Sequence, residues 1–203
     1  MNSPSSLRPR PLIFAVLAAL LLCLNAACNV VTAPGPVGDK PHALDEAKWN
    51  GYWEMRLDED PEDISVFLAR VTDPEAGELE LTGLEENDGK LEASSLRVYV
   101  REIAGTDWLL ASYEDEEAGD GRFFWGRIRI TEDQVLAWIP FPDAFAEWVQ
   151  QGILRGNIED DGDVHLEAMN QEELAALASS EQDEVLFVWP EPLTFRRISR
   201  AVP

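Results

Sequence analysis

The stretch Leu96-Arg97-Val98-Tyr99-Val100-Arg101 decides the fold class, because apolar and polar side chains alternate along it. This period of two places the leucine and both valines on one face of an extended chain, as in a half-buried β-strand. The turn sequence Ala104-Gly105-Thr106-Asp107 follows, and the extended pattern resumes from Trp108 to Tyr113. The region therefore predicts two antiparallel strands joined by a tight connection.

The same combination of extended segments and turn residues recurs along the chain. Asn87-Asp88-Gly89, Asp120-Gly121 and Asp161-Gly162-Asp163 are hairpin signals. The pattern predicts a mainly β protein, an antiparallel sheet or barrel with two short helices. The further extended segments are residues 78–84, 122–130, 153–158, 164–169, 185–189 and 193–198.

Two segments have helical signals instead. Pro142 suits a first helical position, and Phe145, Trp148 and Val149 fall on one face, which predicts a helix over residues 142 to 151. Asn170, followed three residues later by a glutamate, predicts the capped start of a second helix. Both helices are expected to pack on the sheet.

The N-terminus has the features of a secretory signal. Arg8 and Arg10 precede an uninterrupted apolar run from Leu12 to Leu24, and these 13 residues are fewer than the roughly 20 that a membrane-spanning helix needs. Leu24-Asn25-Ala26-Ala27-Cys28 resembles the lipobox of bacterial lipoproteins. The resemblance implies cleavage before Cys28 and acylation, including palmitate, at that cysteine. Cleavage at Ala27 or later would instead give a freely secreted protein.

Three segments then divide the chain. Residues 1–27 are the predicted signal peptide, residues 28–46 a lipidated cysteine and flexible Pro/Gly tether, and residues 47–203 a single acidic β-rich domain. The predicted location is the bacterial cell envelope, with a membrane partner through the lipid anchor. In the lipoprotein family, Asn29 in place of aspartate implies the outer membrane.

The charge is strongly negative, at −23 for the whole chain. Removal of the signal leaves 14 basic and 39 acidic residues, a net charge of −25. Such a surface favours a soluble monomer and argues against nucleic acid as a partner.

A second resemblance begins at Asn50-Gly51-Tyr52-Trp53. Gly-x-Trp at the start of the first strand, with an arginine on the last strand, resembles the structural signature of the calycins, the lipocalin and fatty-acid-binding barrels. It implies that Trp53 closes one end of a barrel and that Arg196 or Arg197 packs across it. The alternative is that Gly51 forms a bulge and Trp53 is an ordinary core residue.

Motifs for catalysis are absent from the sequence. No Gly-x-Ser-x-Gly, HExxH or phosphate-binding loop occurs, and no cysteine follows Cys28. His165 is the one candidate general base in the predicted domain, and a surface role suits a lone strand histidine better. The acidic loops 58–63, 114–117 and 159–163 lack EF-hand spacing, so solvated turns are favoured over calcium sites.

Two function classes remain. The first is a noncatalytic envelope lipoprotein that acts as an interaction or accessory module. The second is a lipocalin-like carrier of a small hydrophobic ligand. No catalytic, cofactor-binding or metal-binding residue is predicted, and the partner is a protein or a small hydrophobic ligand.

Overall fold

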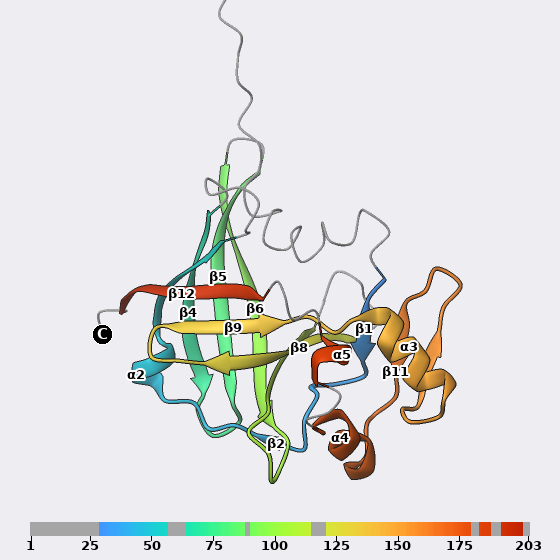
Figure 1. Cartoon of the computed structure of the whole chain (residues 1–203). Coiled ribbons are helices and arrows are strands. Elements are labelled where there is room, and N and C mark those ends of the chain that lie inside the picture. The colour runs from blue at the N-terminus through green and yellow to red at the C-terminus, as the bar shows by residue number, and fades with distance from the viewer. Residues whose placement is uncertain are drawn as a thin grey trace, which may run out of the picture.

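The computed structural model describes residues 29–56, 64–87, 90–114, 121–179, 183–187 and 192–200, and these form a mainly β structure with short helices (Figure 1). The strands are β1 (Val31–Ala33), β2 (Lys40–Pro41), β3 (Gly51–Arg56), β4 (Ile64–Asp73), β5 (Glu78–Asn87), β6 (Lys90–Glu102), β7 (Leu109–Glu114), β8 (Phe123–Ile130), β9 (Gln134–Trp138), β10 (Gly156–Ile158), β11 (Val164–Leu166) and β12 (Leu193–Arg200). The helices are α2 (Glu46–Trp49), α3 (Pro142–Gln150), α4 (Gln171–Leu177) and α5 (Asp183–Leu186).

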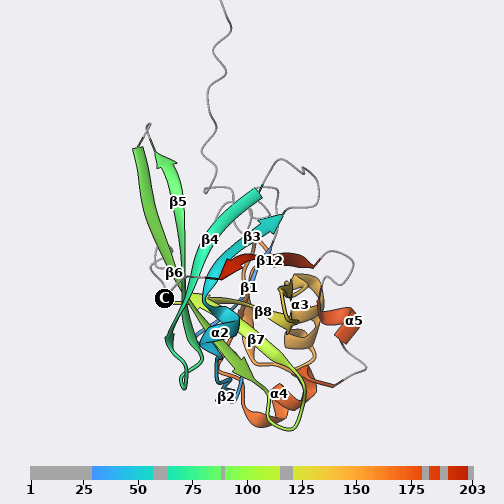
Figure 2. The same ribbon diagram turned by 90° about the vertical axis from the view of Figure 1, so that its left-hand side faces the viewer.

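Eight of the strands close into an antiparallel barrel, as the alternating sequence predicts. Strands β3 to β9 pair in order along the chain, and β12 returns to pair with β3 on one side and β9 on the other. Strands β5 and β6 form the longest hairpin, which extends beyond the neighbouring strands (Figure 2). Closure leaves no open edge within this ring of strands.

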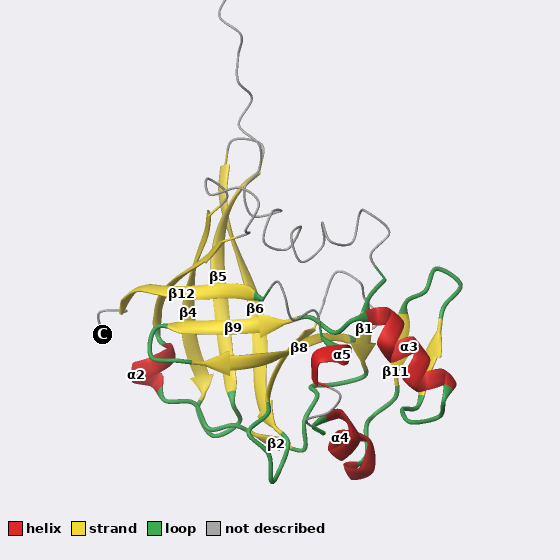
Figure 3. Ribbon diagram, in the orientation of Figure 1, coloured by secondary structure: helices red, strands yellow, loops and turns green. Residues whose placement is uncertain are grey.

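A small sheet extension grows from the barrel wall. The last half of β8 pairs with β9 in the barrel, whereas Phe123 and Phe124 at its start pair with β1. Strand β1 also pairs with β11 in parallel, and β10 completes the extension as its outermost strand. One chain of hydrogen-bonded strands thus joins the barrel to a second lobe, which holds α3, α4 and α5 on the side opposite α2 (Figure 3).

The prediction that residues 28–46 form a flexible tether is wrong from Val31 onward. Strand β1 is buried between β8 and β11, and the amide of Val37 donates to the buried hydroxyl of Ser112 at 3.0 Å. Strand β2 pairs with β6. Pro34, Gly35, Pro36 and Gly38 lie in the connection between these short strands, while Pro41 lies in β2 itself. The composition of the segment therefore does not reveal its strand partners, which are far away in the sequence.

Two apolar cores lie on either side of a shared wall made by β7, β8 and β9. On β7, Leu109 and Ala111 face the barrel core, while Leu110 faces the helices. The helix-side core is aromatic: Phe145 and Phe187 both contact Trp125 in edge-on geometry, with ring centroids 5.4 and 6.1 Å away. Burial on both faces explains why this wall is rich in large apolar residues.

The two predicted helices are confirmed, and the described residues contain two more, α2 and α5. Asn170 and Glu173 form the expected capping box of α4. Residues 185–189 were expected to be extended, but Val185 lies in α5. This single turn brings Leu186 and Phe187 into the aromatic core and leaves Val185 54% exposed, so tertiary packing overrides the strand preference of valine. Helix α2, capped by Asp45, was not predicted.

Glu173 links the start of α4 to Arg155. Its carboxylate accepts hydrogen bonds from Arg155 Nε at 2.9 Å and from the backbone amide of Asn170 at 2.7 Å. The Arg155 guanidinium, followed by the backbone donors, holds the pKa of this carboxyl below its usual value of 4.5. A carboxyl whose pKa is lowered by folding stabilises the fold at pH values above its ordinary pKa. This contribution disappears as the pH falls through the pKa of the folded state.

We therefore expect Glu173→Gln to lower the free energy of unfolding at neutral pH by about 1 kcal/mol, since a charged acceptor becomes neutral. The difference from wild type should shrink below pH 4.5. Urea denaturation at neutral and acidic pH measures both values. The exposed neighbour Glu172→Gln is the control and should change stability little at either pH. An equal loss for Glu173→Gln at both pH values would contradict this account.

Candidate functional site

The tryptophan and one arginine named from the sequence contact each other on adjacent strands of the barrel. Trp53 and Arg197 are cross-strand neighbours on β3 and β12, and the guanidinium carbon of Arg197 lies 5.2 Å from the centroid of a Trp53 ring. Arg197 also donates to the carbonyls of Ala47 at 3.1 Å and Glu132 at 2.9 Å. The Trp53 indole donates to the carbonyl of Trp49 at 2.9 Å. These contacts tie α2 and the β8–β9 turn across the barrel end.

The other residues singled out from the sequence do not join this contact. Gly51 begins β3 with a φ of +151°, a value that side chains disfavour. Arg196 is exposed and pairs in register with Glu54, so the structure selects Arg197 as the arginine beside Trp53. Cys28 lies outside the described residues. The eight-stranded antiparallel barrel is compatible with a calycin-like fold.

Large apolar side chains pack together in the described barrel interior. They form one continuous cluster, to which β7 and β12 contribute partly buried side chains. Two surface hollows of the described chain are lined by the extension and its flanking loops rather than by this cluster. The buried side chains of the barrel core are Leu44, Trp53, Met55, Phe67, Ala69, Leu79, Val98, Val100, Ile128 and Val135.

The larger hollow, of about 450 Å³, lies over the polar face of the extension, and we name it the edge hollow. The two faces of the extension differ in polarity. Val164 and Leu166 are buried on the face toward the helices, while Asn157 and His165 are cross-strand neighbours on the opposite, polar face. The edge hollow is lined by Arg122, Gly156, Asn157, Glu159, His165, Leu166 and Glu167.

Thr32 organises the floor of the edge hollow. Its hydroxyl accepts from Arg122 Nε at 2.7 Å and lies 2.9 Å from His165 Nδ1. Arg122 also donates to the carbonyls of Thr32 at 3.2 Å and Leu166 at 2.8 Å. The hydroxyl can donate to a neutral Nδ1 or accept from a protonated one, since its oxygen has a second lone pair besides the one that Arg122 uses.

This arrangement does not provide an accessible nucleophile. Thr32 is only 3% exposed and lies beneath Arg122 and His165, so a substrate cannot approach its hydroxyl along an open path. The polar groups that reach the surface are instead the Asn157 amide, the imidazole of His165 and the carboxylates of Glu159 and Glu167. Such groups suit recognition of a polar or cationic group by hydrogen bonds and charge.

Sequence reasoning identified His165 but missed its partners. Thr32 and Arg122 are 133 and 43 residues from it in the chain, and they meet only because β1 inserts between β8 and β11. The β-branched pair Val31-Thr32 was the one local sign of a strand in this region.

Metal coordination has no support in the described chain. No group of three histidine, cysteine or carboxylate side chains is placed to hold a metal ion there, and the loop 159–163 is a hairpin turn. Residues 58–63 and most of 114–117 lie outside the described residues. Among the described helices, none has the length and apolar character needed to span a bilayer.

Comparison with known proteins gives no match to a family model, to a curated protein or to a solved structure.

Proposed function

We propose that this protein is a noncatalytic interaction module displayed on the bacterial cell envelope. The observation that carries the proposal is the packed barrel core: Met55 and Val100 are fully buried in it, among aromatic and aliphatic side chains. Carriers in calycin-like barrels hold apolar ligands in an interior cavity. With the interior occupied by its own side chains, the barrel serves as a rigid support for surfaces outside it.

The proposed attachment is an acylated Cys28. If Cys28 is the anchor, only Asn29 and Val30 separate it from β1, a span of about 10 Å in extended form. The Val30 amide donates to Asp163 at 2.8 Å, so even this link is bound to the β10–β11 turn. The domain would therefore lie directly on the bilayer surface, in a fixed orientation, rather than move on a spacer.

Metabolic labelling with a palmitate analogue tests the anchor. We expect the wild-type protein to incorporate the label and to fractionate with membranes, whereas Cys28→Ser should lose both properties. Cys23→Ser is the matched control, because this residue lies within the predicted signal, and should label like wild type. Equal labelling of wild type and Cys28→Ser would contradict the anchor.

Titration with a fluorescent fatty-acid analogue tests the packed barrel core. We expect no saturable fluorescence increase with the folded protein, because the protein's own apolar side chains pack together in the barrel core. Saturable binding with one site per chain would instead support the carrier of a small hydrophobic ligand, and would remove the proposed role of the barrel as a support.

A further inference from the structure

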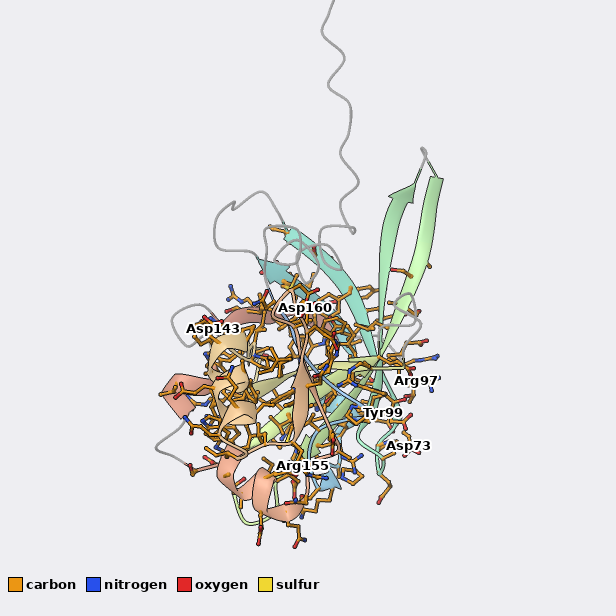
Figure 4. All side chains as sticks on the ribbon, turned by 90° about the vertical axis from the view of Figure 1, so that its right-hand side faces the viewer. Asp73, Arg97, Tyr99, Asp143, Arg155 and Asp160 are labelled. Carbon is orange, nitrogen blue, oxygen red and sulfur yellow. The ribbon has the colours of Figure 1, made fainter. Side chains whose placement is uncertain are left out.

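The outer edge of the extension has no strand partner in the described structure. Strand β10 is the terminal strand of the sheet and pairs only with β11. Figure 4 shows that the segment running from Arg155 to Asp160 lies on the face turned toward the viewer, with these two residues well apart. An unpaired strand edge presents a row of backbone donors and acceptors to solvent.

The hydrogen-bond register identifies which backbone groups face outward. The amide of Glu167 donates to the carbonyl of Arg155, and the amide of Glu159 donates to the carbonyl of Asp163. In an antiparallel pair, every second residue directs its backbone N–H and C=O toward the partner strand. Asn157 lies midway between Arg155 and Glu159, so its backbone N–H and C=O also point toward β11. Gly156 and Ile158 consequently direct theirs away from β11, toward the open edge.

Exposed carboxylates outnumber cations beside this edge. Asn157 and His165 share the face of the edge hollow, whose rim carries the carboxylates of Glu159 and Glu167. Glu159 accepts from the Asn157 side chain at 2.6 Å, and Glu167 forms an exposed ion pair with Arg155 at 3.2 Å, for which a lysine or arginine of a partner would have to compete. Asp160 and Asp161, both exposed, occupy the adjoining turn. The guanidinium of Arg122, the one cation of the lining, is already directed at the carbonyls of Thr32 and Leu166.

We propose that β10 binds an extended basic segment of a partner protein, which adds one strand to the sheet and places a lysine or arginine side chain in the edge hollow. This inference rests on the proposed interaction function and names its partner chemistry. Backbone bonds to Gly156 and Ile158 supply affinity, and the carboxylates select the cationic side chain. A second copy of this chain is disfavoured, because it would bring the same acidic turn to the edge.

The alternation of side chains along a strand determines which residues of the added segment face the edge hollow. Partner residues opposite Gly156 and Ile158 direct their backbone groups to β10, and the residue between them, opposite Asn157, directs its side chain over the edge hollow. The acetylated and amidated peptide Val-Lys-Val-Lys-Val fits this register, with valine amides bonding and lysine side chains facing the carboxylates.

Three forms of this peptide test the proposal by nuclear magnetic resonance of the isotope-labelled protein. We expect the unmodified peptide to shift the amide signals of Gly156 and Ile158 and to slow their hydrogen exchange. N-methylation of the valines should weaken binding about tenfold or more, since backbone hydrogen bonds are lost. N-methylation of the lysines, whose amides face solvent in this register, should preserve binding at the same peptide charge.

Protein variants provide the second arm. Ile158→Pro removes an outward amide without removing a bond to β11 and should abolish the response, while Ile158→Val should bind like wild type. Equal affinity for all three peptides would mean charge attraction alone and would overturn the proposal, as would no response at millimolar peptide. Self-association that Ile158→Pro removes and the peptide does not inhibit would assign the edge to a second copy.

The two proposals fail in different ways. A fatty-acid analogue that binds inside the barrel contradicts the packed barrel core but leaves the peptide result intact. A protein that binds no analogue and no basic peptide contradicts only the strand-addition site.

Discussion

Trp53→Ala should lower the free energy of unfolding by about 3 to 5 kcal/mol, the range for removing a buried tryptophan. Trp53 is 3% exposed, packs among the barrel core residues, donates to the carbonyl of Trp49 and lies beneath Arg197. Its loss would remove apolar contacts and also the group that joins α2 to the barrel end. Equilibrium denaturation in urea measures the change.

Tyr52→Ala is the matched control for this prediction. Tyr52 is the neighbouring residue on the same strand, but its side chain points outward and is 46% exposed. Its replacement should change the free energy of unfolding by no more than about 0.5 kcal/mol. Similar effects at both positions would contradict the buried, structural role of Trp53 in the barrel core.

Val31→Asp should destabilise the protein by at least about 3 kcal/mol, because it places an unpaired charge in the helix-side core. Val31 is buried between β8 and β11 and packs with the aromatic and leucine residues beneath α3 and α4. The residue belongs to the segment whose composition predicts a tether, so a large effect would demonstrate its structural role. Thermal and urea denaturation provide the measurement.

Pro34→Asp is the control that shows whether any aspartate in this segment lowers stability, or only one at a buried position. Pro34 lies directly after β1 and is exposed, so an aspartate there remains in water. We expect little change in stability. If residues 31–36 behaved as a spacer, Val31→Asp and Pro34→Asp would both be neutral, and that result would contradict the insertion of β1 into the sheet.

The barrel could be predicted from sequence because its signals are local. Alternation around Val98 and Val100, and the turn at Gly105, describe neighbouring strands that pair with each other in the structure. The capping box of Asn170 and Glu173 is equally local. Hydrophobic period and turn chemistry act over a few residues, so one sequence is enough to reveal them.

The extension and its polar site could not be predicted in the same way. Strand β1 has three residues, and its partners on β8 and β11 are at least 90 residues away. The contact of Thr32 with Arg122 and His165 follows from that pairing and has no local signal. At the barrel end, the residues Trp53 and Arg197 were named from the sequence, but the choice between Arg196 and Arg197 required the register of β12.

Native mass spectrometry of the protein purified from its host tests the packed barrel core most directly. The account predicts a mass equal to that of the chain with its covalent modifications alone, unchanged after incubation with excess fatty acid. A retained or acquired hydrophobic molecule at one per chain, released only on unfolding, would contradict the account, because it would require a ligand cavity where Met55, Phe67 and Val100 are packed together.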